Sequence, residues 1–140
     1  MSALAKVLAS KGYSVSGSDK NSQKAKDLLK NQTIQVFEEQ SAKNLHQLKS
    51  KKINIVISTA IQERNPELLE AKRLELSIYH RSDLLGALIN KQKSIVISGS
   101  HGKTTTSTII STIFELNKCD PTLIIGGMIP LIKSNAKDGK

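Results

Sequence analysis

The sequence predicts an α/β fold in which parallel strands are joined by crossover helices. Short apolar runs typical of strands alternate with amphipathic runs typical of helices along most of the 140 residues. This alternation is typical of a doubly wound α/β sheet, because a parallel strand needs a long crossover to reach its neighbour. A third observation supports the same fold: the apolar run 95–97 is followed by a glycine-containing turn and another helical run.

The helices are predicted from their apolar faces and their end signals. The first places Leu4 and Val7 on one face, and Gly12 ends it. A later one begins after Asn65, a capping residue that is followed by Pro66 at the first helical position. The predicted helices cover 2–10, 22–29, 42–48, a segment from 66, 82–89 and 107–114, with Ser22 and Ser82 as further caps.

The strands are predicted from the short apolar runs between these helices. They cover 13–16, 34–37, 53–57, 76–79, 95–97 and 122–125, the last being closed by Gly126 and Gly127. The tail 132–140 is polar and has no folding signal of its own.

The predicted sheet lacks a part at each end. In a dinucleotide-binding, Rossmann-like fold, a first strand and its glycine-rich turn precede the first helix, whereas this sequence opens with a helix. One strand after the helix 107–114 is too little to complete a nucleotide-binding sheet. We therefore expect a Rossmann-like parallel sheet without its first strand, followed by the start of a second α/β domain, in a chain cut from a longer protein at both ends.

Composition narrows the classes of protein to which the chain can belong. The formal net charge is +9 and the pI about 9.7, which raises nucleic-acid binding as an alternative. The lysines are scattered, however, and aromatic residues make up 3% of the chain, which leaves few surfaces for stacking bases. The single cysteine, Cys119, excludes an internal disulfide and fits a reducing cytoplasm. No apolar stretch is long enough to span a membrane, and the first residues do not form a signal peptide.

The run Gly-Ser-His-Gly-Lys-Thr-Thr-Thr at 99–106 is the strongest chemical signal in the sequence. Its glycines let backbone N–H groups turn towards phosphate oxygens, and the following helix contributes the partial positive charge of its N-terminus. Lys103 adds a full positive charge, and the Thr104 hydroxyl can ligate a Mg²⁺ ion that bridges the phosphates. The sequence therefore predicts a phosphate-binding loop (P-loop) for a nucleoside triphosphate, with two rather than four residues between its glycines.

This short loop resembles the ATP loop of the Mur ligases, the ATP-dependent amino-acid-adding enzymes of bacterial cell-wall synthesis. Further segments follow the order found in the members that use L-alanine, and together they cover essentially the whole chain. They are Met-Ser-Ala-Leu-Ala (1–5), Gly-Tyr-Ser-Val-Ser-Gly-Ser-Asp (12–19), Ser-Thr-Ala-Ile (58–61), Asn-Pro-Glu (65–67), His-Arg (80–81), Pro-Thr-Leu-Ile-Ile-Gly-Gly (121–127) and Lys-Ser-Asn-Ala (133–136). Any one motif is weak, but the ordered set is specific.

The resemblance implies a cytoplasmic bacterial enzyme of peptidoglycan synthesis that joins L-alanine to the lactyl carboxylate of UDP-N-acetylmuramate, using ATP and Mg²⁺. It implies a UDP-sugar-binding domain over 1–92 and the beginning of a central P-loop ATP-binding domain over 93–140. Lys103 would be catalytic by neutralising the migrating phosphoryl group, and Thr104 would be a metal ligand. His101 is interpreted as a residue that shapes the loop rather than as an acid or base. The whole ATP loop would comprise Gly99, Ser100, His101, Gly102, Lys103, Thr104 and Thr105.

The implied UDP-sugar site consists of residues that follow strands. They are Ser18, Asp19, Ser58, Thr59, Ala60 and Arg81. Asp19 can accept a hydrogen bond from a ribose or sugar hydroxyl, and it suits a simple turn equally well. A plain turn also explains 58–60. The planar guanidinium group of Arg81 can donate two parallel hydrogen bonds to a phosphate or carboxylate of the ligand. A surface ion pair would explain an arginine at this position equally well.

Some features depart from the Mur ligase pattern. Glu39 and Gln40 replace a Gly-His pair that normally precedes the second short helix, which weakens the expected contacts to uridine. The glycine-rich pyrophosphate loop would precede residue 1 and the acidic metal-binding segment would follow residue 140, so we expect no ligase activity from the isolated chain. The alternatives are a non-catalytic module that binds UDP-sugar or ATP, another Mur-type ligase, and a basic nucleic-acid-binding domain.

Overall fold

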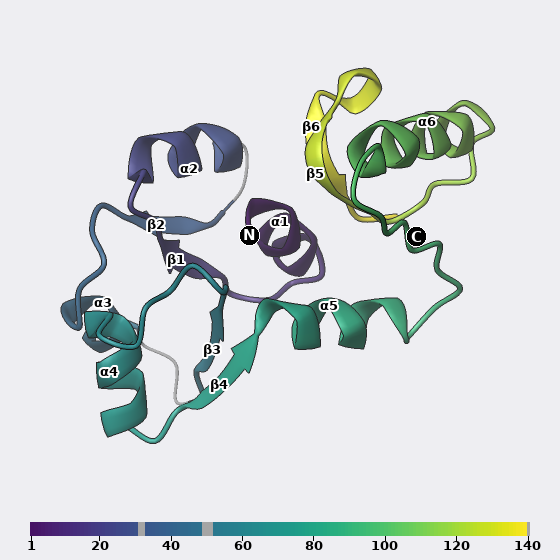
Figure 1. Cartoon of the computed structure of the whole chain (residues 1–140). Helices are drawn as coiled ribbons and strands as arrows, with labels where there is room; N and C mark the ends of the chain where they lie inside the picture. The colour runs from purple at the N-terminus through teal and green to yellow at the C-terminus, as the bar shows by residue number, and fades with distance from the viewer. Residues whose placement is uncertain (31–32, 49–51, 140) are drawn as a thin grey trace. The chain divides into compact units, whose positions relative to one another are not determined.

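The computed structural model describes residues 1–30, 33–48 and 52–139. They form α1 (Ser2–Ser10), β1 (Ser16–Ser18), α2 (Ser22–Leu29), β2 (Gln35–Phe37), α3 (Lys43–His46), β3 (Asn54–Ile57), α4 (Pro66–Arg73), β4 (Ser77–His80), α5 (Arg81–Ile89), α6 (Lys103–Leu116), β5 (Leu123–Ile129), a 3-10 turn η1 (Pro130–Ile132) and β6 (Ser134–Lys137) (Figure 1). The predicted α/β class is confirmed, as are the bounds of the first two helices. No helix in these ranges has the length and apolarity needed to cross a bilayer.

The strands of the described ranges pair two by two, as β1 with β2, β3 with β4 and β5 with β6. β3 and β4 are parallel, and Ile57 at the end of β3 lies opposite His80 at the end of β4. Because α4 lies between them in the chain, this pair has the predicted parallel crossover arrangement. β5 and β6 are instead antiparallel, with an irregular register between Ile124 and Ile129.

The contacts divide the chain into two compact units. The first comprises Met1–Ser16, Asp27–Gln35 and Ile95–Lys140, and the second comprises Gly17–Lys26 and Val36–Ser94. The expected boundary between a domain over 1–92 and a domain over 93–140 stays a prediction.

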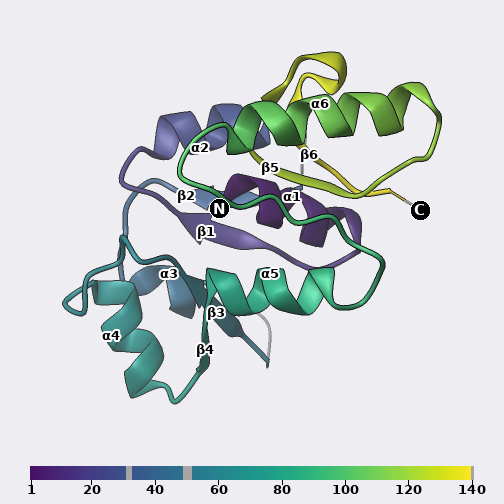
Figure 2. The same ribbon diagram turned by 45° about the vertical axis from the view of Figure 1, so that its right-hand side comes forward.

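The β5–β6 hairpin lies between α1 and α6 in the first unit, as Figure 1 and Figure 2 both show. The predicted inner face of α1 is confirmed, because Leu4 is 6% exposed and Val7 is fully buried. Burial of a side chain the size of valine stabilises a fold by about 1.5–3 kcal/mol. The two apolar clusters of this unit are Ala3, Val7 and Ala136 with Ile124, and Leu123, Ile125 and Ile129 with Ile132.

Two helices of the second unit, α4 and α5, begin after side-chain caps. The predicted cap of α4 is confirmed, since Asn65 Oδ1 accepts hydrogen bonds from the backbone N–H groups of Glu67 (3.0 Å) and Leu68 (3.1 Å). The predicted Ser22 cap of α2 is wrong, because Ser22 is the first residue of the helix and Asn21 Oδ1 accepts from the Lys24 N–H. The predicted Ser82 cap of α5 is wrong as well. His80 caps this helix, because its Nδ1 accepts from the Ser82 N–H and its own N–H donates to Asp83. The reciprocal pair satisfies two backbone donors and starts the helix one residue earlier.

Two further expectations are wrong, on the run 95–97 and on the glycine pair 126–127, and the tail without a folding signal of its own forms a strand. Residues 95–97 do not form a strand; Ile95 and Val96 are 62% and 66% exposed. A strand needs a hydrogen-bonded neighbour, and no strand in the described residues pairs with this run. The glycine pair at 126–127 lies inside β5 rather than closing it, and the tail forms β6.

Other boundaries shift by a few residues. β1 begins at Ser16 rather than at residue 13, and α3 covers only part of 42–48. The helix after the glycine turn is longer than predicted, because it begins at Lys103 rather than at residue 107.

Candidate functional site

The predicted phosphate loop at 99–105 lies in the first unit and leads directly into α6. Gly99 (φ 148°) and Gly102 (φ 75°) have positive backbone φ angles, which residues other than glycine rarely adopt. Gly102 is the N-cap of α6, and no side chain forms a capping hydrogen bond there. The first-turn N–H groups of a 14-residue helix are therefore left for another acceptor, with the positive end of the helix dipole behind them.

Lys103, the first residue of α6, folds back over this loop. Its Nζ donates to the carbonyl oxygens of Gly99 and Ser100, the latter at 3.1 Å. Both acceptors are neutral, and Lys103 has no carboxylate partner within the part of the chain that the structure describes. Residues 100–105 are exposed. An anion bound at the loop would therefore compensate a charge that has no carboxylate partner among the described residues.

Gly127 in β5 lies against the side chain of Thr104. A Cβ atom added at Gly127 would be 2.7 Å from Thr104 Cγ2, whereas one added at the neighbouring Gly126 would have nothing within 4 Å. The absence of a side chain at Gly127 thus allows β5 to approach the first turn of α6. Sequence reasoning missed this role, because the glycine pair was interpreted as the end of a strand.

The residues predicted to hold a UDP-sugar lie in the second unit. Residues 58–60 follow β3, and Arg81 follows β4. Because these parallel strands pair Ile57 with His80, the structure brings 58–60 and Arg81 to the same edge of the sheet. Ser58 is partly buried, whereas Thr59, Ala60 and Arg81 are exposed.

Arg81 makes no ion pair with another described residue. The surface ion pair that the sequence allowed is thus not formed in the described ranges. Arg81 is also the first residue of α5, where the positive end of the helix dipole disfavours a cation. A bound phosphate or carboxylate would offset both charges.

Asp19 and Ser18, which follow one another at the end of β1, have separate hydrogen-bond partners. Asp19 Oδ1 accepts from the Asn21 N–H at 2.8 Å and forms the turn before α2, and Asp19 is exposed. The Ser18 hydroxyl donates to Glu67 Oε2 in α4. The turn that the sequence allowed for Asp19 is therefore present, and it occupies one of the two carboxylate oxygens.

Glu67 joins three segments of the second unit. Its Oε1 accepts from Asn44 Nδ2 at 2.6 Å, and the same Asn44 amide donates to the Glu39 carbonyl oxygen at 2.8 Å. Beside this network Asn65 Nδ2 donates to Gln40 Oε1 at 2.9 Å. The pair Glu39-Gln40, which departs from the Mur ligase pattern, is thus tied to the start of α4. The sequence showed Glu67 only as part of the Asn-Pro-Glu motif, because its contact with Ser18 spans 49 residues.

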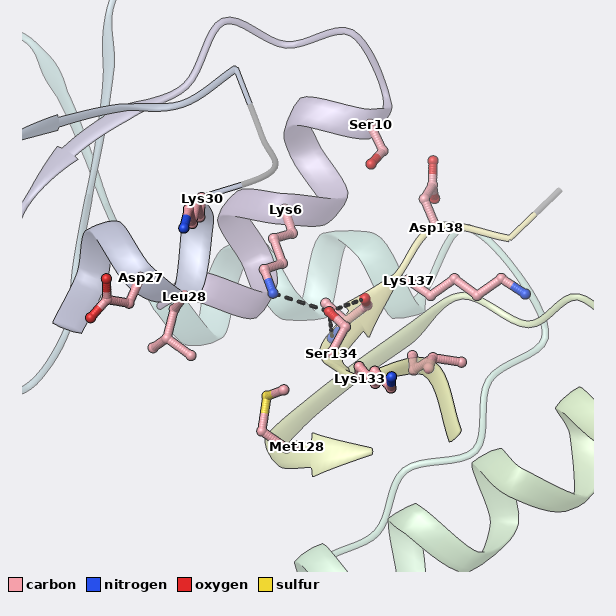
Figure 3. A pocket seen from close by; sticks show the side chains of 12 residues that line it. Lys6, Ser10, Asp27, Leu28, Lys30, Met128, Lys133, Ser134, Lys137 and Asp138 are labelled. Carbon is pink, nitrogen blue, oxygen red and sulfur yellow. Dashed lines mark hydrogen bonds between the residues drawn. The ribbon is translucent and has the colours of Figure 1, made fainter. Parts of the chain in front are cut away.

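The first unit also contains a cavity of about 490 Å³ beside β6 (Figure 3). Several of its charged groups already have protein partners. Lys6 Nζ donates to Ser134 Oγ (3.0 Å) and Asn135 Oδ1 (3.1 Å), and Asp138 forms an ion pair with Lys11 (2.7 Å). Burial lowers the pKa of the Lys6 ammonium group. We interpret the cavity as part of the joint between α1 and β6, and none of the predicted site residues lines it. Its lining residues are Lys6, Ser10, Asp27, Leu28, Lys30, Met128, Ile132, Lys133, Ser134, Ala136, Lys137 and Asp138.

Comparison with known proteins identifies the family. A family model described as the catalytic domain of the Mur ligase family matches residues 1–93. The chain belongs to the Mur ligase family. The resemblance inferred from the ordered motifs is thereby confirmed.

Relatives within this family are similar over the whole chain. The UDP-N-acetylmuramate–L-alanine ligase of Synechococcus sp. (strain CC9311) is 50% identical over 99% of this chain. The enzyme of the same name from a strain of Prochlorococcus marinus is 52% identical over 100% of it. The chain spans 29% and 30% of the length of these two proteins.

Solved Mur ligase structures share the fold. The UDP-N-acetylmuramate–alanine ligase MurC of Thermotoga maritima superposes with a TM-score of 0.88 at 25% identity, covering 99% of this chain and 32% of that one. The ligase for UDP-N-acetylmuramate:L-alanyl-gamma-D-glutamyl-meso-diaminopimelate from Neisseria meningitides gives 0.89 at 24% identity over 100% of this chain and 43% of that one. The second comparison shows the fold alone.

Proposed function

We propose that this chain is part of an ATP-dependent ligase that joins L-alanine to the lactyl carboxylate of UDP-N-acetylmuramate. The observation that carries the proposal is the uncapped start of α6 behind a glycine loop, with the uncompensated Lys103 ammonium folded over it. The names of relatives that are about half identical along the whole chain support the same reaction. The product would be a precursor of peptidoglycan, made in the cytoplasm of a bacterium.

The residues of the loop fit the phosphates of ATP. Positive φ angles at Gly99 and Gly102 and the uncapped first turn of α6 provide backbone donors for phosphate oxygens. Lys103 would exchange its contacts with two carbonyl groups for contacts with phosphate. ATP, when bound, supplies the phosphoryl group that activates the carboxylate, and Lys103 stabilises charge on that group during transfer.

Mg²⁺ would be held partly by the phosphates, with the Thr104 hydroxyl as the ligand that this chain supplies. No group of three or more His, Cys, Asp or Glu side chains suited to a metal occurs in the described residues. A single hydroxyl ligand is consistent with Mg²⁺, which keeps several waters and binds through phosphates and few protein groups. Gly127 leaves room for the Thr104 methyl group, which a Cβ atom at that position would approach to 2.7 Å.

The UDP-sugar would bind in the second unit at the ends of the strands. Arg81 would pair with an anionic group of the ligand, because it has no ion pair in the described residues and stands at the positive end of α5. Residues 58–60 would offer backbone amides and hydroxyls beside it. Ser18 and Asp19 would contact hydroxyl groups of the ligand.

The proposal is tested by turnover of the full-length protein with UDP-N-acetylmuramate, L-alanine and MgATP. We expect phosphate release that requires all three substrates and falls about a hundredfold to a thousandfold in Lys103→Ala, the range for loss of one group that stabilises developing charge. Lys91→Ala, which removes an exposed lysine outside the loop, should leave the rate unchanged. Release that is independent of L-alanine, or equal in both variants, would contradict the proposal.

A further inference from the structure

Glu67 determines which kind of hydrogen bond Ser18 can offer to a ligand. A serine hydroxyl has one hydrogen to donate and lone pairs that accept. The Ser18 hydrogen is directed to Glu67 Oε2, so Ser18 Oγ is left with acceptor capacity alone. The neighbouring Asp19 carboxylate is also an acceptor. The side chains of Ser18 and Asp19 therefore present acceptors only.

The orientation of the Glu67 carboxylate is fixed from two sides. Its Oε1 accepts from the buried Asn44 at 2.6 Å, while its Oε2 accepts from Ser18. Its backbone N–H donates to Asn65 Oδ1 at 3.0 Å. Because Asn44 donates its second hydrogen to the carbonyl of Glu39, its amide cannot turn without losing a buried hydrogen bond.

An acceptor-only surface selects the chemistry of its ligand. A phosphate group is itself an acceptor, so it gains nothing from Ser18 Oγ and is repelled by the Asp19 carboxylate. A sugar hydroxyl can donate to either group. Ribose hydroxyls are also the usual partners of an acidic residue at a strand end in a dinucleotide-type fold.

We propose that Glu67 is a positioning residue that commits the Ser18 hydroxyl to accept, so that Ser18 and Asp19 take a ribose hydroxyl of the nucleotide sugar rather than its phosphates. The proposal rests on the proposed function, because it assumes that a nucleotide sugar binds to this unit. Glu67 acts through Ser18 and does not itself contact the ligand.

Glu67→Gln reverses the direction of the hydrogen bond between Ser18 and residue 67, with little change in the shape of the side chain at 67. Asn44 still requires an acceptor, so the Gln oxygen faces Asn44 and the Gln amide nitrogen faces Ser18. Ser18 Oγ then accepts from this amide, and its own hydrogen points to the position of the ligand hydroxyl. The ligand hydroxyl can then no longer donate to Ser18 Oγ, so the arrangement of donor and acceptors that holds it in the wild type is lost.

The test measures kcat and KM of the full-length enzyme with UDP-N-acetylmuramate and with its 2′-deoxy- and 3′-deoxyuridine counterparts. In Glu67→Gln we expect KM for the natural substrate to rise about fivefold to tenfold, the size of one hydrogen bond. KM for ATP should not change. For the counterpart that lacks the bound hydroxyl, the variant and the wild type should have the same KM.

Glu70→Gln is the matched control, because Glu70 lies one turn further along α4 and pairs with Arg73 and His46 at the surface. It should leave KM unchanged for UDP-N-acetylmuramate and for both deoxyuridine counterparts. Ser18→Ala is the second variant: it should reproduce the rise in KM, and Glu67→Gln should add nothing to it.

The proposal is overturned if Glu67→Gln and Glu70→Gln have equal KM values, or if Glu67→Gln raises KM equally for natural and deoxy substrates. The second result would assign Glu67 a purely structural role. Failure of the proposed function is distinct, because the wild type itself would then neither bind nor turn over UDP-N-acetylmuramate.

Discussion

The phosphate loop and the end of β1 differ in whether their polar groups have hydrogen-bond partners within the protein. Around Glu67, each carboxylate oxygen and both amide hydrogens of Asn44 have protein partners. At the start of α6, the first turn has no side-chain cap and Lys103 contacts only carbonyl groups of its own loop. Buried polar groups without partners are costly, whereas exposed ones are solvated by water. The difference suggests that one region orients a few side chains, while the other keeps its donors for an anion.

The largest effect that tests this contrast is expected at Gly127. Gly127→Ala places a methyl group 2.7 Å from Thr104 Cγ2 and must displace the first turn of α6 or its threonine. We expect KM for ATP in the full-length enzyme to rise about tenfold to a hundredfold, because small misplacements at a reacting group are costly. KM for the UDP-sugar should not change.

Gly126→Ala is the control for this substitution, since its methyl group would meet no atom within 4 Å. Thr104→Ser in the Gly127→Ala background removes the clashing methyl group, retains the hydroxyl and should restore much of the ATP affinity. If Gly127→Ala binds ATP as well as the wild type, the close approach of β5 does not position Thr104.

Local signals in the sequence predicted much of this architecture. The bounds of α1 and α2 followed from apolar faces and end residues, and the Asn65 cap followed from a single triplet. The glycines and Lys103 of the phosphate loop are contiguous, so their proximity was predictable without tertiary structure. The positions of 58–60 and Arg81 after strands were predicted, whereas their shared edge depends on the pairing of β3 with β4.

Long-range contacts account for most of what the sequence did not reveal. β6 has a polar sequence and forms because it pairs with β5, while Lys6 of α1 reaches Ser134 across 128 residues. The run 95–97 has the composition of a strand but pairs with no strand in the described residues. Hydrogen bonds between distant residues, such as that between Ser18 and Glu67, leave no periodic signal in a sequence.

A smaller effect is expected when the satisfied network loses its helix cap. Asn65→Ala removes two hydrogen bonds to the first turn of α4 and one to Gln40. We expect the free energy of local opening of α4, measured by hydrogen exchange, to fall by about 1–2 kcal/mol.

Asn21→Ala is the matched comparison, because Asn21 Oδ1 accepts from the Lys24 N–H in an exposed position before α2. Its loss should cost about 0.5 kcal/mol, at the low end of the range for exposed caps. Equal losses in the two variants would show that burial and the contact with Gln40 add nothing to the network around Glu67.

The smallest effect is expected at the far end of α6, where the charges are paired. Lys137 Nζ contacts Asp120 and Glu115, each at 2.8 Å, and the hydrogen bonds to Asp120 and then to Glu115 raise the pKa of Lys137 above its usual 10.5. A pKa that is raised on folding adds stability below the unfolded pKa, and this contribution is lost as the pH rises through the folded value. Lys137→Gln should therefore lower the free energy of unfolding by about 0.5 kcal/mol at pH 7 and by progressively less above pH 10.5.

Denaturation of the wild type and the variant between pH 7 and 11 measures the difference, with Lys93→Gln as the control at an exposed lysine. A difference that does not change with pH would mean that the packing of the Lys137 side chain, rather than its charge, holds β6 to α6.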